Sequence, residues 1–161
     1  MIFVTLGTQD KPFKRLIKAV ERQIDLGNIT EEVIVQSGCT DYKSDKMKII
    51  NYMNGEEFNK YLKEASVIIT HAGVGTIIKS LEENKKVIAA ARKMVYGEHV
   101  NNHQQQILDN FSIKGYILPL RSFRKLNEVL DKVESFKPEK FESNNEAFCN
   151  SLEKEIEAIL S

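Results

Sequence analysis

Short apolar runs alternate with amphipathic stretches along most of this 161-residue chain. The runs are apolar at consecutive positions, which is typical of parallel strands covered on both faces. The expected strands are Ile2–Leu6, Glu32–Gln36, Lys48–Tyr52, Val67–Thr70, Val87–Ala91 and Gly115–Leu118. The expected helices are Pro12–Leu26, Glu56–Ala65, Gly75–Glu83, His99–Phe111 and Phe123–Val133. This alternation predicts an α/β fold, a single Rossmann-like domain with a mostly parallel sheet flanked by helices.

The end of the chain follows a different pattern. Within Asn144–Leu160, four apolar residues recur at four-residue spacing among Glu and Lys: Phe148, Leu152, Ile156 and Leu160. This pattern predicts an amphipathic helix, either packed on its own domain or extended as an arm onto another subunit. We expect the α/β domain to span residues 1–136, followed by a connector and this C-terminal helix over residues 137–161.

Composition and charge exclude some classes of function. The chain has 23 basic and 23 acidic side chains, and its lysines are interspersed with glutamates, so we expect no nucleic-acid partner. The two cysteines, Cys39 and Cys149, are far apart and suit reduced thiols in a cytoplasmic protein. The strand expected at Ile2 begins at once, so we expect neither a signal peptide nor a transmembrane helix.

The most informative segment runs from His71 to Thr76. There an apolar strand meets a helix through a turn that contains Gly73 and Gly75. The first N–H groups of such a helix lack intrahelical partners, so the turn is suited to an anion. Glycines let a phosphate approach the backbone, and Thr76 adds a hydroxyl donor. The alternative is a tight turn that binds nothing.

Two further segments follow expected strands and therefore lie at the same carboxyl edge of the sheet, where open α/β sheets bind ligands. One is the turn around Gly7 and Thr8, which taken alone is more often only a turn. The other is the loop between Arg92 and Gln106, which is rich in Glu, His, Asn and Gln and suits hydroxyl and carbonyl groups of a sugar. A polar loop without a ligand remains the alternative. A metal site made by His71, His99 and His103 is a further alternative, because the expected helix places His99 and His103 one turn apart, but no Cys or Asp cluster accompanies them.

Three strings together resemble a known family: Val4-Thr5-Leu6-Gly7-Thr8, His71-Ala72-Gly73-Val74-Gly75-Thr76 and Tyr96-Gly97-Glu98-His99-Val100-Asn101-Asn102-His103-Gln104. They resemble the C-terminal, donor-binding half of GT-B glycosyltransferases, of the family 28 type. The resemblance is greatest to the stand-alone subunits of two-component enzymes. These include the transferase that adds the second GlcNAc to the dolichol-linked oligosaccharide, and bacterial pairs for capsule and exopolysaccharide synthesis.

The resemblance implies half of a GT-B fold that holds a UDP-sugar as substrate, with no metal or other cofactor. The implied donor-binding residues are Gly7, Thr8, His71, Gly73, Gly75, Thr76, Arg92, Glu98, Asn102, His103 and Gln104. Among them, Gln104 is the best candidate for a contact with the donor sugar. His71 and His99 are weak candidates for the catalytic base, which we expect on a partner. Related enzymes carry a Glu that binds the ribose hydroxyls where this chain has Lys79, so the ribose contact is rebuilt or lost.

The resemblance also implies a partner. A full GT-B enzyme has a second domain that binds the acceptor, and here a separate membrane-anchored subunit would supply it. The expected function is transfer of a hexose or N-acetylhexosamine to a polyprenyl-diphosphate-linked saccharide with inversion, at the cytoplasmic face of the membrane. Two alternatives stay open. One is a non-catalytic nucleotide-binding or enhancer subunit, favoured by Lys79. The other is a sugar-nucleotide epimerase, which the missing second domain disfavours.

Overall fold

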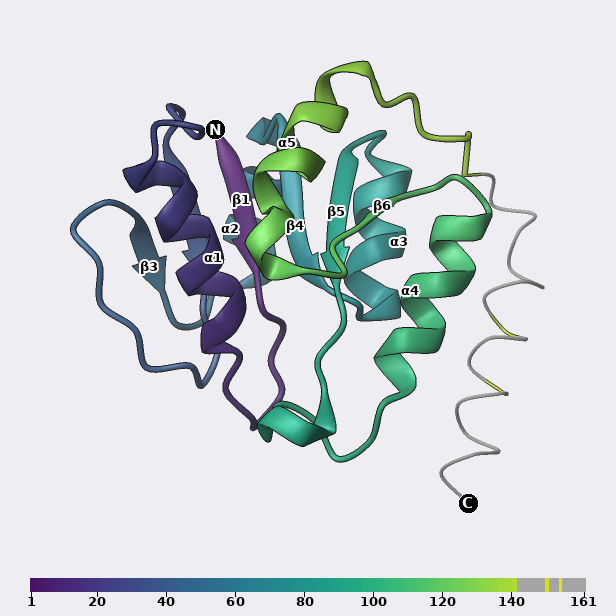
Figure 1. Cartoon of the computed structure of the whole chain (residues 1–161), viewed down its shortest axis with the longest axis horizontal. Coiled ribbons are helices and arrows are strands. Elements are labelled where there is room, and N and C mark those ends of the chain that lie inside the picture. Colours follow the sequence, from purple (N-terminus) through teal and green to yellow (C-terminus); the bar gives the residue numbers. More distant parts are fainter. Residues whose placement is uncertain (142–149, 151–153, 155–161) are drawn as a thin grey trace.

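The computed structural model describes residues 1–141, 150 and 154, so the expected C-terminal helix lies outside the described residues. The strands are β1 (Ile2–Thr5), β2 (Val33–Gln36), β3 (Lys48–Ile50), β4 (Val67–His71), β5 (Lys86–Ala90) and β6 (Leu118–Pro119). All neighbouring pairs are parallel, in the order β3-β2-β1-β4-β5-β6 (Figure 1). The predicted single Rossmann-like domain is confirmed.

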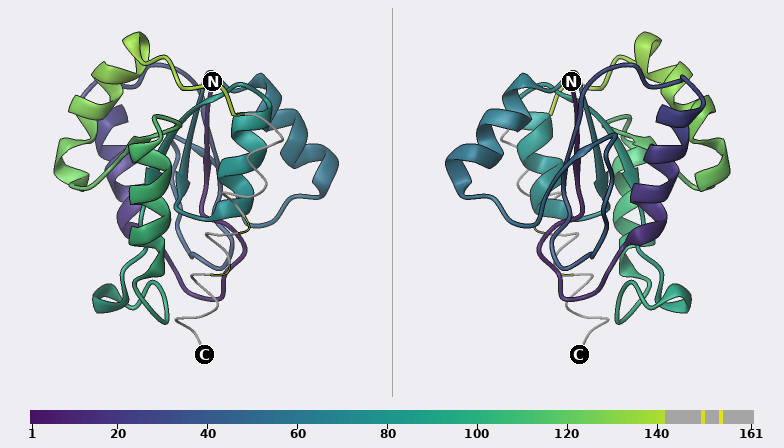
Figure 2. Two further views of the ribbon diagram at one scale, coloured as in Figure 1. Left: turned by 90° about the vertical axis from the view of Figure 1, so that its right-hand side faces the viewer. Right: turned by 90° about the vertical axis from the view of Figure 1, so that its left-hand side faces the viewer.

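Helices cover both faces of the sheet (Figure 2). One face packs against α1 (Lys14–Asp25) and α5 (Leu126–Ser135), and the other against α2 (Gly55–Glu64), α3 (Val74–Glu82) and α4 (His103–Ile113). Side chains alternate along each strand, so Val4, Val35 and Ile69 belong to the first core. Phe3, Ile34 and Ile68 belong to the second core. Burial on both faces explains why the strands are apolar at consecutive positions.

Near the carboxyl ends of β1, β2 and β4, the second face changes from apolar to polar. Two residues after Phe3, Ile34 and Ile68, the same face presents Thr5, Gln36 and Thr70, which are also register neighbours. The order of the strands reverses between β1 and β4, which makes this edge the topological switch point of the sheet. A ligand site is therefore expected here.

The predicted helix His99–Phe111 is wrong at its start, since α4 begins at His103. A short 3-10 helix, Met94–Tyr96, follows β5, and Gly97 then adopts a left-handed conformation with φ of 68°. The N–H of His103 donates to Asn101 Oδ1 at 3.0 Å, so residues 97–102 form a turn rather than helix. His99 and His103 are therefore not one turn apart on a helix.

The other helices and strands begin and end within a few residues of the boundaries expected from the sequence. The predicted helix Phe123–Val133 divides into a 3-10 turn, Phe123–Lys125, and α5. The first part of the expected connector packs on the domain: the N–H of Glu139 donates to the Gly115 carbonyl at 3.0 Å, and the Phe141 and Tyr116 rings are 5.4 Å apart. No helix among the described residues is long and apolar enough to cross a membrane.

Candidate functional site

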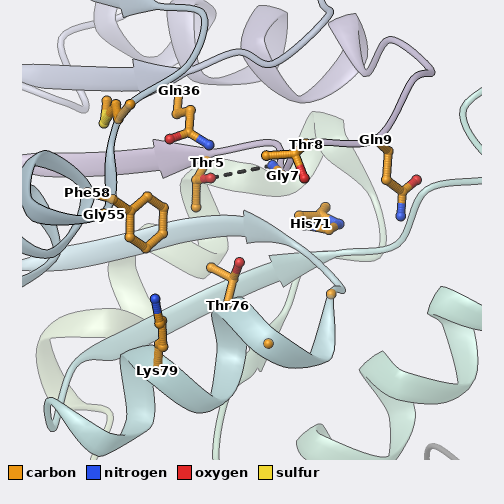
Figure 3. A pocket seen from close by; sticks show the side chains of 13 residues that line it. Thr5, Gly7, Thr8, Gln9, Gln36, Gly55, Phe58, His71, Thr76 and Lys79 are labelled. Atoms are coloured by element: carbon orange, nitrogen blue, oxygen red, sulfur yellow. Dashed lines mark hydrogen bonds between the residues drawn. The ribbon is translucent and has the colours of Figure 1, made fainter.

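A pocket of about 500 Å³ opens at the carboxyl ends of β1, β2 and β4, at the switch point of the sheet. Its lining comes from four parts of the chain: the strand ends, the turn after β1, the start of α2 and the first turns of α3 (Figure 3). The lining residues are Thr5, Gly7, Thr8, Gln9, Gln36, Met53, Gly55, Phe58, His71, Gly73, Gly75, Thr76 and Lys79. Both glycine turns expected from the sequence therefore meet in one cavity.

His71 lies packed between the two glycine turns. A methyl group built on Gly7 would lie 2.5 Å from His71 Nε2, and one built on Gly73 would lie 2.4 Å from His71 Cε1. Gly7 also has a φ of 74°, a conformation that side chains other than glycine rarely adopt. Because neither glycine carries a Cβ atom, the imidazole fits between the two turns and lines the pocket.

A relay of hydrogen bonds fixes the proton position on His71. Gln104 Oε1 accepts from the Arg92 backbone N–H at 2.9 Å, and Gln104 Nε2 lies 3.1 Å from His71 Nδ1. Because the amide NH₂ group only donates, Nδ1 must accept, and the proton of a neutral imidazole lies on Nε2. Nε2 is the atom that lies against Gly7 at the pocket wall. His71 is therefore a hydrogen-bond donor at the site.

The charge state of His71 agrees with this role. Burial, together with the positive charge of Arg92 and with His99, lowers the pKa of His71 to about 3. The ring is therefore neutral at physiological pH, and it is too weakly basic to accept a proton there. The geometry and the pKa both disfavour His71 as the catalytic base. His99 is only partly buried, and burial also lowers its pKa.

Arg92 and Glu98 lie outside the pocket, in the scaffold beneath it. Arg92 is 2% exposed, and its guanidinium donates to the carbonyls of Leu6, Lys11 and Glu98. The Glu98 carboxylate accepts two bonds of 2.7 Å from Arg15 and one of 3.0 Å from the Lys93 N–H. These bonds hold the loop after β5 against the turn after β1. Both residues therefore position the site without lining the pocket.

The other residues expected in the loop after β5 also lie outside the pocket lining. Gln104 is 3% exposed and is bonded to Arg92 and His71, so in this structure it supports His71 rather than facing the cavity. Asn102 is exposed, and its Oδ1 accepts from the Met94 N–H at 3.0 Å. His103 begins α4. The structure thus brings together Gly7, Thr8, His71, Gly73, Gly75 and Thr76, and leaves the remaining five expected residues around them.

Sequence reasoning missed several lining residues, of which Gln36 is the most informative. It ends β2, it is 5% exposed, and its Oε1 has no hydrogen-bond partner among the described residues. An unpaired buried polar atom costs about 1–3 kcal/mol and requires an explanation. A polar residue ending an otherwise apolar strand was the available signal. Phe58 and Met53 were missed because they come from α2 and the segment before it.

The pocket is suited to an anion with an apolar part. The first turn of α3 has no side-chain cap at Gly73, so its N–H groups remain available to a ligand. Lys79 adds a cation to the lining, and its Nζ lies 5.5 Å from the centre of the Phe58 ring. Within the described part of the chain, no cluster of three His, Cys, Asp or Glu residues has a geometry for metal binding.

This strand order, with a pocket at the carboxyl edge of the switch point, defines a Rossmann-like nucleotide-binding domain, the kind of domain from which each half of a GT-B glycosyltransferase is built. Residues 1–159 match the model of the glycosyltransferase family 28 C-terminal domain. The chain therefore belongs to this family, as the sequence motifs predicted.

Relatives among characterised proteins are yeast proteins named UDP-N-acetylglucosamine transferase subunit ALG13. The protein of Candida glabrata is 42% identical over 98 residues, which cover 61% of this chain and 41% of the relative. The protein of Saccharomyces cerevisiae is 33% identical over 91 residues, which cover 52% of this chain and 43% of the relative. The protein of Candida albicans is 28% identical over 100 residues, which cover 62% of this chain and 32% of the relative. The chain thus matches less than half the length of each.

Solved structures show the same fold. The NMR solution structure of ALG13 superposes with a TM-score of 0.60 at 24% identity, covering 94% of both chains. The crystal structure of the glycosyltransferase SnogD from Streptomyces nogalater superposes with a TM-score of 0.50 at 17% identity, covering 85% of this chain and 40% of that one. At these identities the similarity concerns the fold alone.

Proposed function

We propose that this chain is the donor-binding, catalytic subunit of a two-component inverting glycosyltransferase. It binds a UDP-sugar and transfers a hexose or N-acetylhexosamine to a polyprenyl-diphosphate-linked saccharide. The observation that supports this most strongly is the pocket itself, where two glycine turns, the uncapped start of α3 and the His71 Nε2–H converge in a domain of family 28. The relatives named as subunits of a UDP-N-acetylglucosamine transferase favour the same class.

The chemistry follows from the charge that develops during transfer. When an acceptor hydroxyl displaces UDP from the anomeric carbon, negative charge grows on the leaving diphosphate. Backbone N–H groups of Gly75 and Thr76, the Thr76 hydroxyl and His71 Nε2–H are donors suited to stabilise that charge. This donor set would act without a metal ion. The catalytic base remains assigned to the partner, because His71 is neutral and already protonated at Nε2.

The partner, acceptor and location extend this proposal. A half-site open to water cannot align donor and acceptor, so a membrane-anchored acceptor-binding subunit would complete it at the cytoplasmic face of the membrane. The yeast relatives lend no support to the bacterial capsule or exopolysaccharide setting, which stays a prediction from the sequence motifs. In this proposal Lys79, which donates hydrogen bonds but cannot accept them, contacts oxygen atoms of the ribose or the diphosphate.

A second candidate function is supported by Lys79. Its ammonium stands where related enzymes carry a ribose-binding Glu. If the ribose contact is lost with that Glu, the chain would be a non-catalytic nucleotide-binding or enhancer subunit. Activity of the assembled pair distinguishes the two candidates. An enhancer tolerates the loss of His71 Nε2–H in a His71→Phe variant, whereas a donor subunit loses activity with it.

Thermal unfolding with UDP, UDP-glucose, UDP-galactose, UDP-GlcNAc and a GDP-sugar tests nucleotide binding directly. UDP and one UDP-sugar, at a hundred times their dissociation constants, should stabilise the protein by about 2.7 kcal/mol. For a chain of this length the melting temperature then rises by about 5–10 °C. The GDP-sugar serves as the control. A chain that no nucleotide stabilises, alone or co-expressed with its partner, would contradict the proposal.

Replacing Gly75 by alanine should change the affinity for UDP and the stability of the unliganded protein in opposite directions. Gly75 is the second residue of α3, and a methyl group built on it meets nothing within 4 Å. The unliganded variant should therefore be more stable by about 0.5–1 kcal/mol, because alanine favours a helix. The methyl group nevertheless narrows the pocket at the anion end, so UDP should bind about tenfold more weakly. Calorimetric titration with UDP measures this, and unchanged affinity would place the diphosphate elsewhere.

A further inference from the structure

Gln36 presents a buried acceptor, Oε1, that no residue in the described part of the chain satisfies. Its side chain projects from the end of β2 on the same face as Thr5 and lines the cavity (Figure 3). Only 5% of the residue is exposed, and Oε1 has no partner among the described residues. The backbone carbonyl of Gln36, in contrast, accepts from the Leu6 N–H at 3.0 Å. A ligand that carries a hydrogen-bond donor would satisfy Oε1.

The pocket has two chemically different ends. The two glycine turns, after β1 and after β4, form with His71 between them the end that is suited to a diphosphate. Gln36 and Phe58 lie on the side away from His71 and Gln9, with Lys79 opposite Gln36 (Figure 3). The ring of Phe58 gives that end an apolar surface (Figure 3). A nucleoside diphosphate has the same two parts, an anionic diphosphate and a flat base.

We propose that Gln36 recognises the N3 edge of the uracil base of the donor, an inference that rests on the proposed function. Uracil presents an N3–H donor between two carbonyl acceptors. A carboxamide is complementary to that edge, because Oε1 accepts from N3–H while the NH₂ group donates to a neighbouring carbonyl. The base lies against Phe58, and the diphosphate reaches the glycine turns. Gln36 is therefore a specificity-determining residue of the donor site.

The experiment pairs a change in the protein with a change in the ligand. Calorimetric titration compares UDP with 3-methyl-UDP, in which a methyl group replaces the N3 hydrogen, on the full chain and on Gln36→Met. Wild type should bind 3-methyl-UDP about tenfold more weakly than UDP, since Oε1 would again be unpaired. In Gln36→Met, UDP affinity should fall about tenfold and the difference between the two ligands should disappear.

Two controls make the result specific. Gln23→Met removes another buried glutamine, which lies on α1, is 2% exposed and accepts a hydrogen bond from Asn28. This variant should leave the ratio of the two affinities unchanged. Comparison with 2′-deoxy-UDP tests the ribose, and its penalty should be the same in wild type and Gln36→Met. The unliganded Gln36→Met variant should melt no lower than wild type, because it loses an unsatisfied polar group.

The experiment distinguishes a wrong assignment of Gln36 from a wrong proposed function. If wild type binds UDP but Gln36→Met keeps the full 3-methyl penalty, or if the 2′-deoxy penalty disappears instead, the assignment to the base edge is overturned while UDP binding stands. If wild type binds no UDP, alone or with its partner, both this assignment and the proposed function fail.

Discussion

Replacing Gly7 by alanine should destabilise the domain by about 2–5 kcal/mol and abolish nucleotide binding. Two costs combine at this position. The φ of 74° is unfavourable for any residue with a Cβ atom, and the added methyl would lie 2.5 Å from His71 Nε2. His71 cannot move away easily, because Gln104 holds Nδ1 and only 6% of the residue is exposed. Chemical denaturation measures the free energy of unfolding.

Two other glycines separate these costs. Gly27 has a φ of 78° and nothing within 4 Å of a built methyl, so Gly27→Ala should show backbone strain alone, about 1–2 kcal/mol. Gly73 has an ordinary φ of −90° but would place its methyl 2.4 Å from His71, so Gly73→Ala should show overpacking alone, about 1–3 kcal/mol. A Gly7→Ala variant as stable as Gly27→Ala would show that His71 does not pack as described.

Acidification below pH 6.5 should destabilise the folded protein through His71. In the unfolded chain this histidine titrates near 6.5, whereas burial, Arg92 and His99 lower its pKa to about 3 in the fold. Between those values the unfolded state binds a proton that the folded state does not. Stability is therefore complete above pH 6.5 and falls as pH decreases, by up to about 1.4 kcal/mol per pH unit. The lowered pKa of His99 acts in the same direction.

The matched variant is His71→Gln, which keeps a polar side chain beside Gln104 but does not titrate. Denaturation at pH 6.5, 6.0, 5.5 and 5.0 stays above the range in which Glu31, whose pKa is lowered from 4.5 by its bonds to the N-terminus and Ser66, begins to lose its charge. The loss of stability with falling pH should be steeper in wild type than in the variant. Equal slopes would mean that the fold does not lower the pKa of His71, and the assignment of a neutral ring whose Nδ1 accepts from Gln104 would be withdrawn.

Much of the fold follows from local patterns in the sequence. Consecutive apolar residues marked the strands, and a 3.6-residue period marked helices such as α1, whose Leu16, Ile17 and Val20 are all buried. Gly7 and Gly73 marked the two turns at the carboxyl edge that line the pocket. The start of α4 could not be predicted, because a polar segment such as residues 97–102 gives no apolar period. In that segment the left-handed conformation of Gly97 and the hydrogen bond from the His103 N–H to the Asn101 side chain keep α4 from beginning before His103.

The pocket depended on contacts between distant parts of the chain. Gln104 was expected to contact the donor sugar, yet it bonds His71, 33 residues earlier. Arg92 bonds the Leu6 carbonyl, 86 residues earlier, and Glu98 pairs with Arg15, 83 residues earlier. The type of a polar residue does not reveal whether its side chain faces a ligand or a buried partner. Only the packing decides between these roles.

The sequence by itself therefore determined the family, the α/β class and the two glycine turns, because periodicity, glycine and helix-start signals act over a few neighbouring residues. The tertiary structure alone decided that Gln36 and Phe58 face the pocket, that Gln104, Arg92 and Glu98 lie beneath it, and that His71 is neutral with its proton on Nε2. Burial and hydrogen bonding set protonation and access, and both arise only when strands far apart in the sequence come together in one sheet.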